Sequence, residues 1–421
     1  MRKVAIVSEH ASPLATVGGV DSGGQNIYVA HVARQLARLG YSVDVFTRRD
    51  HALQPLIVNW RNRVRVIHVP AGPPRFVAKE ELLPYMTDFA AFLGKFCSAQ
   101  KHAYDIIHAN FFMSGLVARE VARLLSIPFV MTFHALGRVR RVFQKEADRF
   151  PSDRFAIEDE LMRDADRIIA ECPQDLYDML SLYRASSRKI DVVPCGFDPE
   201  EFWPVSRASA RERLGWGADE FAVLQLGRMV ARKGVDNVIR AVALLQKEHG
   251  LRAYLYIVGG NSDEPNEVAT PEIGRLRALA RELGVASQVV FVGRRRRDQL
   301  RLFYSAADVF VTTPWYEPFG ITPVEAMACG VPVIGAAVGG IKHTVRDGET
   351  GFLVPPRDPG SLARCLAQLH RDRTLAREMG QAARRRATKL FTWRTVSIDI
   401  ADVYERAIAR ESNPLPAQLA M

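Results

Sequence analysis

The residues best suited to chemistry lie in the stretch WYEPFGITPVEAMACG, residues 315–330. Thr322, Pro323 and Glu325 have the order of an N-cap, a first helical residue and a capping-box partner, so a helix is expected to begin here. Unpaired N–H groups and the dipole of a helix N-terminus attract phosphate. The N–H groups in this position are those of Phe319, Gly320 and Ile321.

Two carboxylates, Glu317 and Glu325, flank this predicted phosphate site with seven residues between them. A carboxylate beside a phosphate does not bind it, and its natural partner is a neutral hydroxyl group. Glu325 could simply cap its helix, whereas Glu317 lies ahead of the helix among Tyr, Pro and Gly and has no such structural role. We therefore predict that Glu317 is functional.

A pair of cations, Arg228 and Lys233, lies five residues apart between Gly227 and Gly234. A guanidinium offers a planar fork of donors and an ammonium a point charge, so the two could straddle a diphosphate. Taken alone, the pattern also fits a solvated loop.

A glycine-rich loop, residues 18–24, precedes a helix predicted from about Gly24 to Leu39. Ser22 and Gln25 have capping-box spacing. Glycine permits a close approach of backbone to ligand. The loop lacks the order GxGxxG, and no acidic residue follows at the distance needed for a nicotinamide ribose, which argues against a dehydrogenase.

One histidine, His134, ends an apolar run in the first half of the chain. A lone histidine is more often structural than functional. Arg138, Arg140 and Arg141 follow it and could either bind a phosphate or be solvated.

The elements that must position these residues alternate between short apolar strands and helices. Strands are predicted at residues 4–7, 43–46, 105–108, 129–132 and 167–170, then at 223–227, 253–258, 289–292, 309–312 and 331–334. This alternation indicates an α/β fold of doubly wound parallel sheets. A Pro- and Arg-rich break at residues 194–220 indicates two Rossmann-like domains, residues 1–200 and 201–394, with a last helix at about 395–412 crossing back to the first. Ligands of such sheets bind outside the carboxyl ends of the strands, toward a common cleft.

The overall composition is that of a globular protein. The chain has 421 residues, 48% of them hydrophobic, and 57 basic against 47 acidic side chains give a net charge of +10. This charge permits anionic ligands without selecting one. Five scattered cysteines without a CxxC pair predict free thiols, and no apolar run is long enough for a signal peptide or a membrane span. We expect a cytoplasmic protein with at most a peripheral membrane contact.

Two further patterns are discounted. Asp164-Ala-Asp166 has the DxD form of a metal site but leads directly into the strand at 167–170, so a structural role is expected and no metal. Arg294 to Arg297 have no interleaved aromatic residues, which argues against nucleic-acid binding. A solvated turn is expected there, with a contribution near a donor base as the alternative.

The stretch EPFGITPVEAMACGVPVI resembles the signature of retaining glycosyltransferases with the GT-B fold, in the large glycosyltransferase family 4 that includes sucrose-phosphate synthase and the enzyme initiating mycothiol synthesis. The resemblance implies that Glu317 and the backbone amides after it contact the donor sugar. It also implies that Glu325 holds the nucleotide ribose, and that Arg228 and Lys233 neutralise the leaving diphosphate.

Motifs in the first half are similar to the same family. DSGGQNIYV resembles a DTGGQ loop, which implies that Gly23 and Gly24 lie over the donor diphosphate. FHALGR resembles HSLGR, which implies that His134 meets the donor sugar at the reacting centre.

The resemblance also suggests which residues bind the acceptor and which kind of acceptor it is. RFVAKEELLPY (75–85) is similar to the RKEDLWPY segment of sucrose-phosphate synthases. This suggests Lys79 for a phosphorylated acceptor. Arg154, four residues before Glu158, falls where relatives place a phosphate-binding arginine, and Arg138 after His134 is a further candidate. Relatives that bind inositol phosphate have a tyrosine in the segment matching residues 110–112, where this chain has Phe111 and Phe112. A sugar phosphate such as fructose 6-phosphate is therefore favoured over inositol phosphate, a lipid-linked sugar or a natural-product aglycone.

The implied activity is retaining transfer of a sugar from a nucleotide diphosphate sugar, with UDP favoured over GDP or ADP and with no metal or other cofactor required. The diphosphate would leave as an anion, the acceptor would attack on the same face, and a phosphate oxygen would take its proton. The rivals are a nucleotide-sugar epimerase of the same fold and a non-catalytic nucleotide-sugar binder. The latter would be expected to lack Arg228, Lys233 or Glu317.

Overall fold

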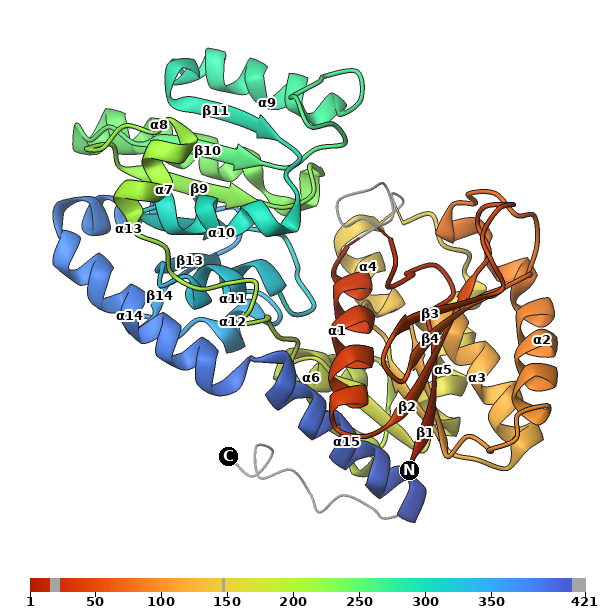
Figure 1. Ribbon diagram of the computed structural model, residues 1–421. Helices are drawn as coiled ribbons and strands as arrows, with labels where there is room; N and C mark the ends of the chain where they lie inside the picture. The colour runs from red at the N-terminus through yellow and green to blue at the C-terminus, as the bar shows by residue number, and fades with distance from the viewer. Residues whose placement is uncertain (16–22, 146–147, 411–421) are drawn as a thin grey trace. The chain divides into compact units, whose positions relative to one another are not determined.

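The computed structural model describes residues 1–15, 23–145 and 148–410 (Figure 1). The described chain divides into two compact units. The first unit holds residues 1–15, 23–194 and 393–410, and the second holds residues 195–392. Each has a central sheet with helices on both faces, so the predicted α/β fold of two parallel-sheet domains is confirmed.

The sheet of the first unit has eight strands in the order β3-β4-β2-β1-β5-β6-β7-β8. All neighbours pair in parallel except β3 and β4. The strands are β1 (Lys3–Val7), β2 (Ser42–Arg48), β3 (Ile57–Arg61), β4 (Val64–Val69), β5 (Ile106–Asn110), β6 (Phe129–Thr132), β7 (Arg167–Ala170) and β8 (Ile190–Val192). The apolar pattern did not predict β3, β4 or β8. β3 is a largely exposed edge strand and β8 has only three residues, so neither has a long apolar run.

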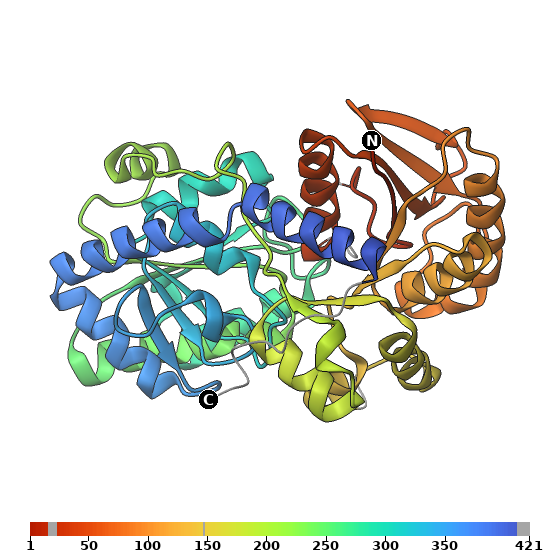
Figure 2. The same ribbon diagram turned by 90° about the horizontal axis from the view of Figure 1, so that it is seen from below.

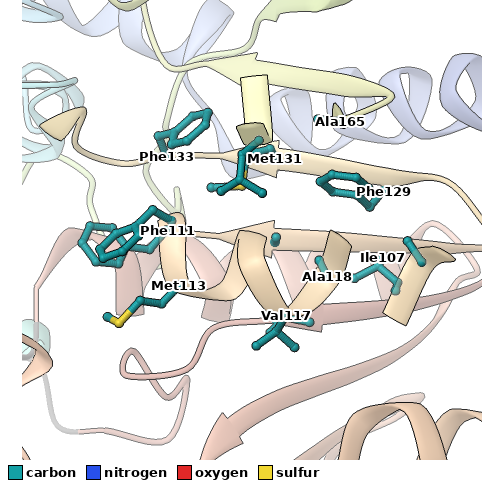
Figure 3. Packing of buried hydrophobic residues seen from close by; sticks show 14 of the residues in the cluster. Ile107, Phe111, Met113, Val117, Ala118, Phe129, Met131, Phe133 and Ala165 are labelled. Carbon is teal, nitrogen blue, oxygen red and sulfur yellow. The ribbon is translucent and has the colours of Figure 1, made fainter. Parts of the chain in front are cut away.

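Helices cover both faces of this sheet. They are α1 (Gly24–Arg38), α2 (Met86–Ser98), α3 (Phe112–Leu125), α4 (Gly137–Gln144), α5 (Asp153–Asp164), α6 (Pro173–Tyr183) and α15 (Trp393–Ala409), with short 3-10 turns η1 (Lys79–Glu81), η2 (Leu83–Tyr85) and η4 (Ser187–Lys189). Figure 3 shows part of the core, where Ile107, Phe129 and Met131 of neighbouring strands lie beside Val117 and Ala118 of α3. This packing fixes the strand ends that carry the candidate site.

The last helix, α15, belongs to the first unit and lies beside α1 (Figures 1 and 2). Trp393 is fully buried and stacks on the His31 ring, with centroids 5.3 Å apart. Farther along α15, the Tyr404 hydroxyl lies 2.7 Å from Nδ1 of His108. Burial lowers the pKa of His108 to about 3, so this ring is neutral near pH 7. The helix thus returns to the unit where the chain began; it was expected at about residues 395–412.

The sheet of the second unit is parallel throughout, in the order β11-β10-β9-β12-β13-β14. Its strands are β9 (Ala222–Leu226), β10 (Tyr254–Val258), β11 (Val289–Gly293), β12 (Val309–Thr312), β13 (Val333–Ala336) and β14 (Gly351–Val354). Its helices are α7 (Arg207–Leu214), α8 (Val235–His249), α9 (Pro271–Glu282), α10 (Arg297–Ala306), α11 (Ile321–Ala328), α12 (Ile341–Thr344), α13 (Pro359–Arg371) and α14 (Arg373–Leu390), with η5 (Ala231–Lys233) and η6 (Ala286–Gln288).

The order of the second sheet reverses between β9 and β12, because β10 follows β9 on one side and β12 lies on the other. In the first sheet the equivalent point lies between β1 and β5. Loops leaving the two strands at such a point turn to opposite faces and leave a crevice for a ligand. The loops after these strands are therefore the natural places for a site in each unit.

All five cysteines are free thiols, as predicted. Within the described ranges, no helix combines the length and the apolar character that a membrane span needs.

Candidate active site

The loops after β9 and β12 bring the predicted cation and carboxylate residues of the second unit together. Lys233 ends η5 after β9, and its Nζ contacts the carboxylate of Glu317, which follows β12. Both side chains are largely buried, with exposed fractions of 18% and 15%. Burial lowers the pKa of Lys233, although the Glu317 charge opposes this effect. Without a ligand, the two groups predicted for diphosphate and hydroxyl recognition therefore neutralise each other.

The backbone holds these two loops against each other. Gly234 adopts φ +66°, and a Cβ at this position would overlap the carbonyl oxygen of Thr313. The Thr313 hydroxyl donates to the carbonyl of Gly234 at 2.9 Å, and the Trp315 N–H donates to the Arg232 carbonyl at 2.9 Å. Glycine is therefore required where the chain passes closest to β12. Arg228 lies in the same loop, between β9 and η5.

The helix after Glu317 begins earlier than its capping pattern predicted. α11 starts at Ile321 with Gly320 as its N-cap, and Gly320 has φ +92°. The predicted N-cap, Thr322, lies inside the helix, so that assignment was wrong. No side chain caps α11. Of the three N–H groups predicted to attract phosphate, those of Gly320 and Ile321 belong to the N-cap and the first residue of α11.

A glycine pair that the sequence reasoning missed fixes the Glu317 loop. The Gly340 N–H donates to the carbonyl oxygens of Glu317 and Pro318, both at 3.1 Å. A Cβ at Gly339 would overlap the Glu317 carbonyl, and one at Gly340 would overlap the backbone of Phe319. The available signal was the adjacent pair of glycines just after β13, because paired glycines often mark close backbone contacts.

Glu325 is not a capping residue. Its side chain is 1% exposed. One carboxylate oxygen lies 2.7 Å from Nη1 of Arg297, and the other accepts a hydrogen bond from the Tyr304 hydroxyl at 2.9 Å. Arg297 also contacts Glu201 at 2.6 Å.

The expectation of a solvated turn at Arg294 to Arg297 is therefore wrong for its last member. Arg294 and Arg296 do form ion pairs on the more exposed part of the turn, with Asp263 and Asp298. Arg297 begins α10 and points inward, because only the helical register after the turn brings it toward Glu325.

In the first unit, His134 is held by two partners. It follows β6 with φ +57°, an uncommon backbone conformation for a residue with a side chain. Nδ1 lies 2.9 Å from Oε1 of Glu171, which follows β7, and Nε2 lies 3.0 Å from Oδ1 of Asn110 at the end of β5. The Tyr28 ring meets the imidazole edge to face at 4.8 Å. Neither Glu171 nor Asn110 was predicted from the sequence. The available signal was their position, because Asn110 is the last residue of β5 and Glu171 directly follows β7.

The start of α1 also differs from the sequence-based prediction. Gly23 is the N-cap, and its N–H donates to Oδ1 of Asn26 at 2.9 Å. The capping partner is thus Asn26 rather than Gln25; the proposed cap, Ser22, lies outside the described residues. Gln25 instead donates to the Asn110 carbonyl at 3.2 Å. A Cβ at Gly23 would meet nothing within 4 Å, and Gly24 is the first helical residue.

Two of the acceptor candidates, Arg138 and Arg154, form ion pairs within the first unit. Arg138 forms a two-pronged ion pair with Asp159, at 2.5 and 2.6 Å. Arg154 is 1% exposed; its Nε lies 2.7 Å from Glu158, and its Nη2 contacts the Ala135 carbonyl. Arg154, predicted to bind the acceptor phosphate, is therefore enclosed, although its Nη1 has no hydrogen-bond partner among the described residues.

The rings around Arg154 are those of Phe111, Phe112 and Phe150, each within 5 Å of the guanidinium carbon. Lys79 begins η1, on the connection between β4 and α2. Asp166 accepts a hydrogen bond from the Phe129 N–H at 2.9 Å, which is the structural role expected for the DxD pattern.

Two Rossmann-like units, each with polar or charged groups in the loops after its strands, are the architecture of the GT-B glycosyltransferases. The family description "Glycosyl transferases group 1" matches residues 206–386, and "Glycosyltransferase Family 4" matches residues 22–201. The chain belongs to glycosyltransferase family 4, and it is a retaining glycosyltransferase with the GT-B fold.

Relatives over the full length support this assignment. The chain is 36% identical to the D-inositol 3-phosphate glycosyltransferase of Corynebacterium jeikeium, with 96% of each chain covered. It is 37% identical to the protein of the same name from Acidothermus cellulolyticus, with 100% of this chain and 93% of the relative covered. Sucrose-phosphate synthase from Thermosynechococcus elongatus has a similar structure, with a TM-score of 0.88, 33% identity, and coverage of 97% of this chain and 100% of the other.

The packing at Gly340 makes a direct test of how the Glu317 loop is held. We expect Gly340→Ala to lower the free energy of unfolding of the second unit by about 1–3 kcal/mol, because the new methyl group would overlap Phe319 backbone. Urea denaturation followed by circular dichroism measures this change. The matched control is Gly360→Ala in α13, where the nearest atoms to a Cβ are side chains at 3.5 Å or more. Equal stability of the two variants would contradict the proposed contact.

Proposed function

We propose that this enzyme transfers a sugar from a nucleotide diphosphate sugar, with a UDP-sugar preferred, to a hydroxyl group of a small phosphorylated acceptor. The observation that carries the proposal is the contact between Lys233 and Glu317 at the switch point of the second sheet. It joins a cation suited to a diphosphate and a carboxylate suited to sugar hydroxyls, beside the start of α11. GDP- and ADP-sugars are the alternative donors.

The leaving group decides what the protein has to supply. A nucleoside diphosphate leaves as an anion, so it needs stabilisation of negative charge rather than a proton. Arg228, Lys233 and the first N–H groups of α11 offer this. Retaining glycosidases instead use two carboxyl groups about 5 Å apart, one of them a nucleophile. Here Glu325 is bound by Arg297 and Tyr304, so it is poorly placed to attack.

Retention of configuration at the anomeric carbon then requires no covalent enzyme intermediate. The acceptor hydroxyl attacks the anomeric carbon on the face from which the diphosphate departs. The bond from that carbon to the diphosphate oxygen breaks, and a phosphate oxygen takes the hydroxyl proton. Glu317 orients the sugar through its hydroxyl groups once a diphosphate has drawn Lys233 away from it. His134 is assigned to the donor sugar as well, on the strength of the family resemblance.

The phosphorylated acceptor is supported by the names of the relatives. D-inositol 3-phosphate glycosyltransferase and sucrose-phosphate synthase both refer to phosphate-bearing polyols or sugars. We favour a sugar phosphate such as fructose 6-phosphate, because Phe111 and Phe112 offer no hydroxyl group to an inositol phosphate. Lys79, with Arg138 and Arg154, is proposed to receive the acceptor phosphate.

A nucleotide-release screen tests the reaction. UDP-, GDP- and ADP-sugars carrying glucose, N-acetylglucosamine or mannose are combined with fructose 6-phosphate, inositol phosphate or no acceptor. We expect acceptor-dependent release of UDP, reduced about 100-fold or more in Glu317→Gln and in Lys233→Met, because each removes a group that acts on the transition state. Lys247→Met, an exposed lysine of α8, is the control. A wild-type protein that binds no nucleotide sugar would refute the proposal.

The acceptor assignment has its own test. We expect Lys79→Ala to raise the Michaelis constant of the phosphorylated acceptor about tenfold or more while the dissociation constant of UDP stays unchanged, since an ion pair to phosphate is lost. Lys95→Ala, at an exposed site on α2, is the matched control. Steady-state kinetics measure the first quantity and calorimetry the second. An unchanged Michaelis constant would exclude Lys79 from phosphate recognition.

The lowered pKa of Lys233 predicts a pH dependence of donor binding. A bound diphosphate favours the charged ammonium, so Lys233 takes up a proton on binding wherever the free protein has lost it. UDP affinity should therefore fall as the pH rises through the range below about 10.4, the pKa of an ordinary lysine. In Lys233→Arg the charge persists, so its affinity should fall less. Calorimetric titrations over this range compare the two proteins, and identical profiles would contradict the prediction.

A further inference from the structure

We propose that Arg297 is a positioning residue for donor recognition, which holds the Glu325 carboxylate ionised and fixed in direction for the ribose hydroxyl groups of the nucleotide. This inference rests on the proposed function. It goes beyond the sequence pattern, in which Arg297 was the last member of a basic turn.

The Arg297 guanidinium links two carboxylates from distant parts of the second unit. Its Nε lies 2.6 Å from Oε2 of Glu201, and its Nη1 lies 2.7 Å from Oε1 of Glu325. The Phe202 ring lies 4.7 Å from the guanidinium carbon. With Tyr304 donating to the second oxygen of Glu325 at 2.9 Å, both oxygens have a fixed donor. The carboxylate can therefore keep only one orientation.

The Arg297 charge favours the ionised form of Glu325. Burial raises the pKa of Glu325, and the charge on Glu201 acts in the same direction. Arg297 opposes both, together with the hydrogen bond from Tyr304. If Arg297 were neutral, Glu325 would take up a proton more readily. A protonated carboxyl group is a poorer acceptor for a hydroxyl group than a carboxylate is.

One nitrogen of Arg297 remains available to bind a ligand. Its Nη2 is buried and has no hydrogen-bond partner within the described part of the chain. A buried donor without a partner is unfavourable, so an oxygen atom that reached it would be bound. A hydroxyl group can donate to Glu325 and accept from Nη2 at the same time. The Glu325 carboxylate and Nη2 of Arg297 are therefore together complementary to a vicinal diol. A phosphate would be repelled by Glu325.

A purely structural ion pair would have a different signature from a positioning role. Loss of a structural pair lowers the stability of the unit and weakens every nucleotide alike. Loss of a positioning residue removes the preference for a ribose over a ribose that lacks a hydroxyl group. The discriminating quantity is therefore the ratio of the dissociation constants of 2′-deoxy-UDP and UDP.

Calorimetry on the full chain measures this ratio for the wild type, Arg297→Met and Arg297→Lys. We expect the wild type to prefer UDP by about tenfold or more, the size of one hydrogen bond to a charged group. In Arg297→Met the ratio should fall to within about twofold. In Arg297→Lys it should fall at least about threefold, because one ammonium cannot hold two carboxylates as a guanidinium fork does. Arg296→Met, a neighbour whose side chain is 79% exposed, should keep the wild-type ratio.

The outcomes separate the two proposals. A wild type that binds UDP and 2′-deoxy-UDP equally overturns the role of Arg297 and leaves the proposed function standing. So does a folded Arg297→Met that keeps the full preference. If the methionine variant fails to fold, an undiminished preference in Arg297→Lys overturns the inference. A wild-type protein that binds no UDP contradicts both the role of Arg297 and the proposed function.

Discussion

Parallel pairing about one central strand in each unit is the constraint on which the arrangement of the candidate site depends. β1 lies between β2 and β5, and β9 lies between β10 and β12. The central strands are buried almost throughout, so they can hold few polar groups. Charged and polar side chains therefore gather in the loops after the strands. Since parallel strands all end at the same edge of a sheet, those loops converge, and residues far apart in sequence become neighbours.

Buried charge is the second theme, and the buried charged groups of the candidate site contact oppositely charged side chains. Arg154 is paired with Glu158, Arg297 with Glu201 and Glu325, and Lys233 contacts Glu317. An unpaired buried charge would be costly, so these pairs keep the site folded when no ligand is bound. A ligand must compete with the protein partner or use a remaining bonding position. Such competition favours ligands whose charge and hydroxyl pattern match the site, which serves specificity more than affinity.

The first unit is not a continuous stretch of chain, and this affects the surroundings of His134. α15 brings the Trp393 ring against the His31 ring. The Tyr28 ring contacts both Trp393, at 5.8 Å, and His134, at 4.8 Å, in both cases edge to face. Packing of the last helix is thus connected to the surroundings of His134 through Tyr28 of α1, and also through the contact of Tyr404 with His108. Helix and site should be considered together when substitutions in α15 are interpreted.

The sequence by itself determined the fold class, the family and most of the candidate residues. Buried parallel strands are continuous apolar runs, and the loop motifs after them are local patterns of glycine and charge, so both can be read from neighbouring residues. The strands β3 and β8 were missed because edge position or short length removes the apolar run. β4 was missed although it is largely buried, because Arg65 and His68 interrupt its apolar residues, and the four-residue strand β14 was missed as well. The true start of α11 was missed because Gly320 takes a positive φ that no capping pattern specifies.

Only the tertiary structure decided which charges are partners. Glu325 was expected to cap its helix or to hold the ribose, Arg297 to be solvated and Arg154 to bind a phosphate, and each proved to be part of a buried pair or triad. Glu171 and the pair Gly339 and Gly340 gained their roles in the same way, from strands and loops that the fold brings together. The physical reason is that an ion pair or a backbone contact depends on position in space. Glu201 and Arg297, 96 residues apart, carry no local pattern that links them.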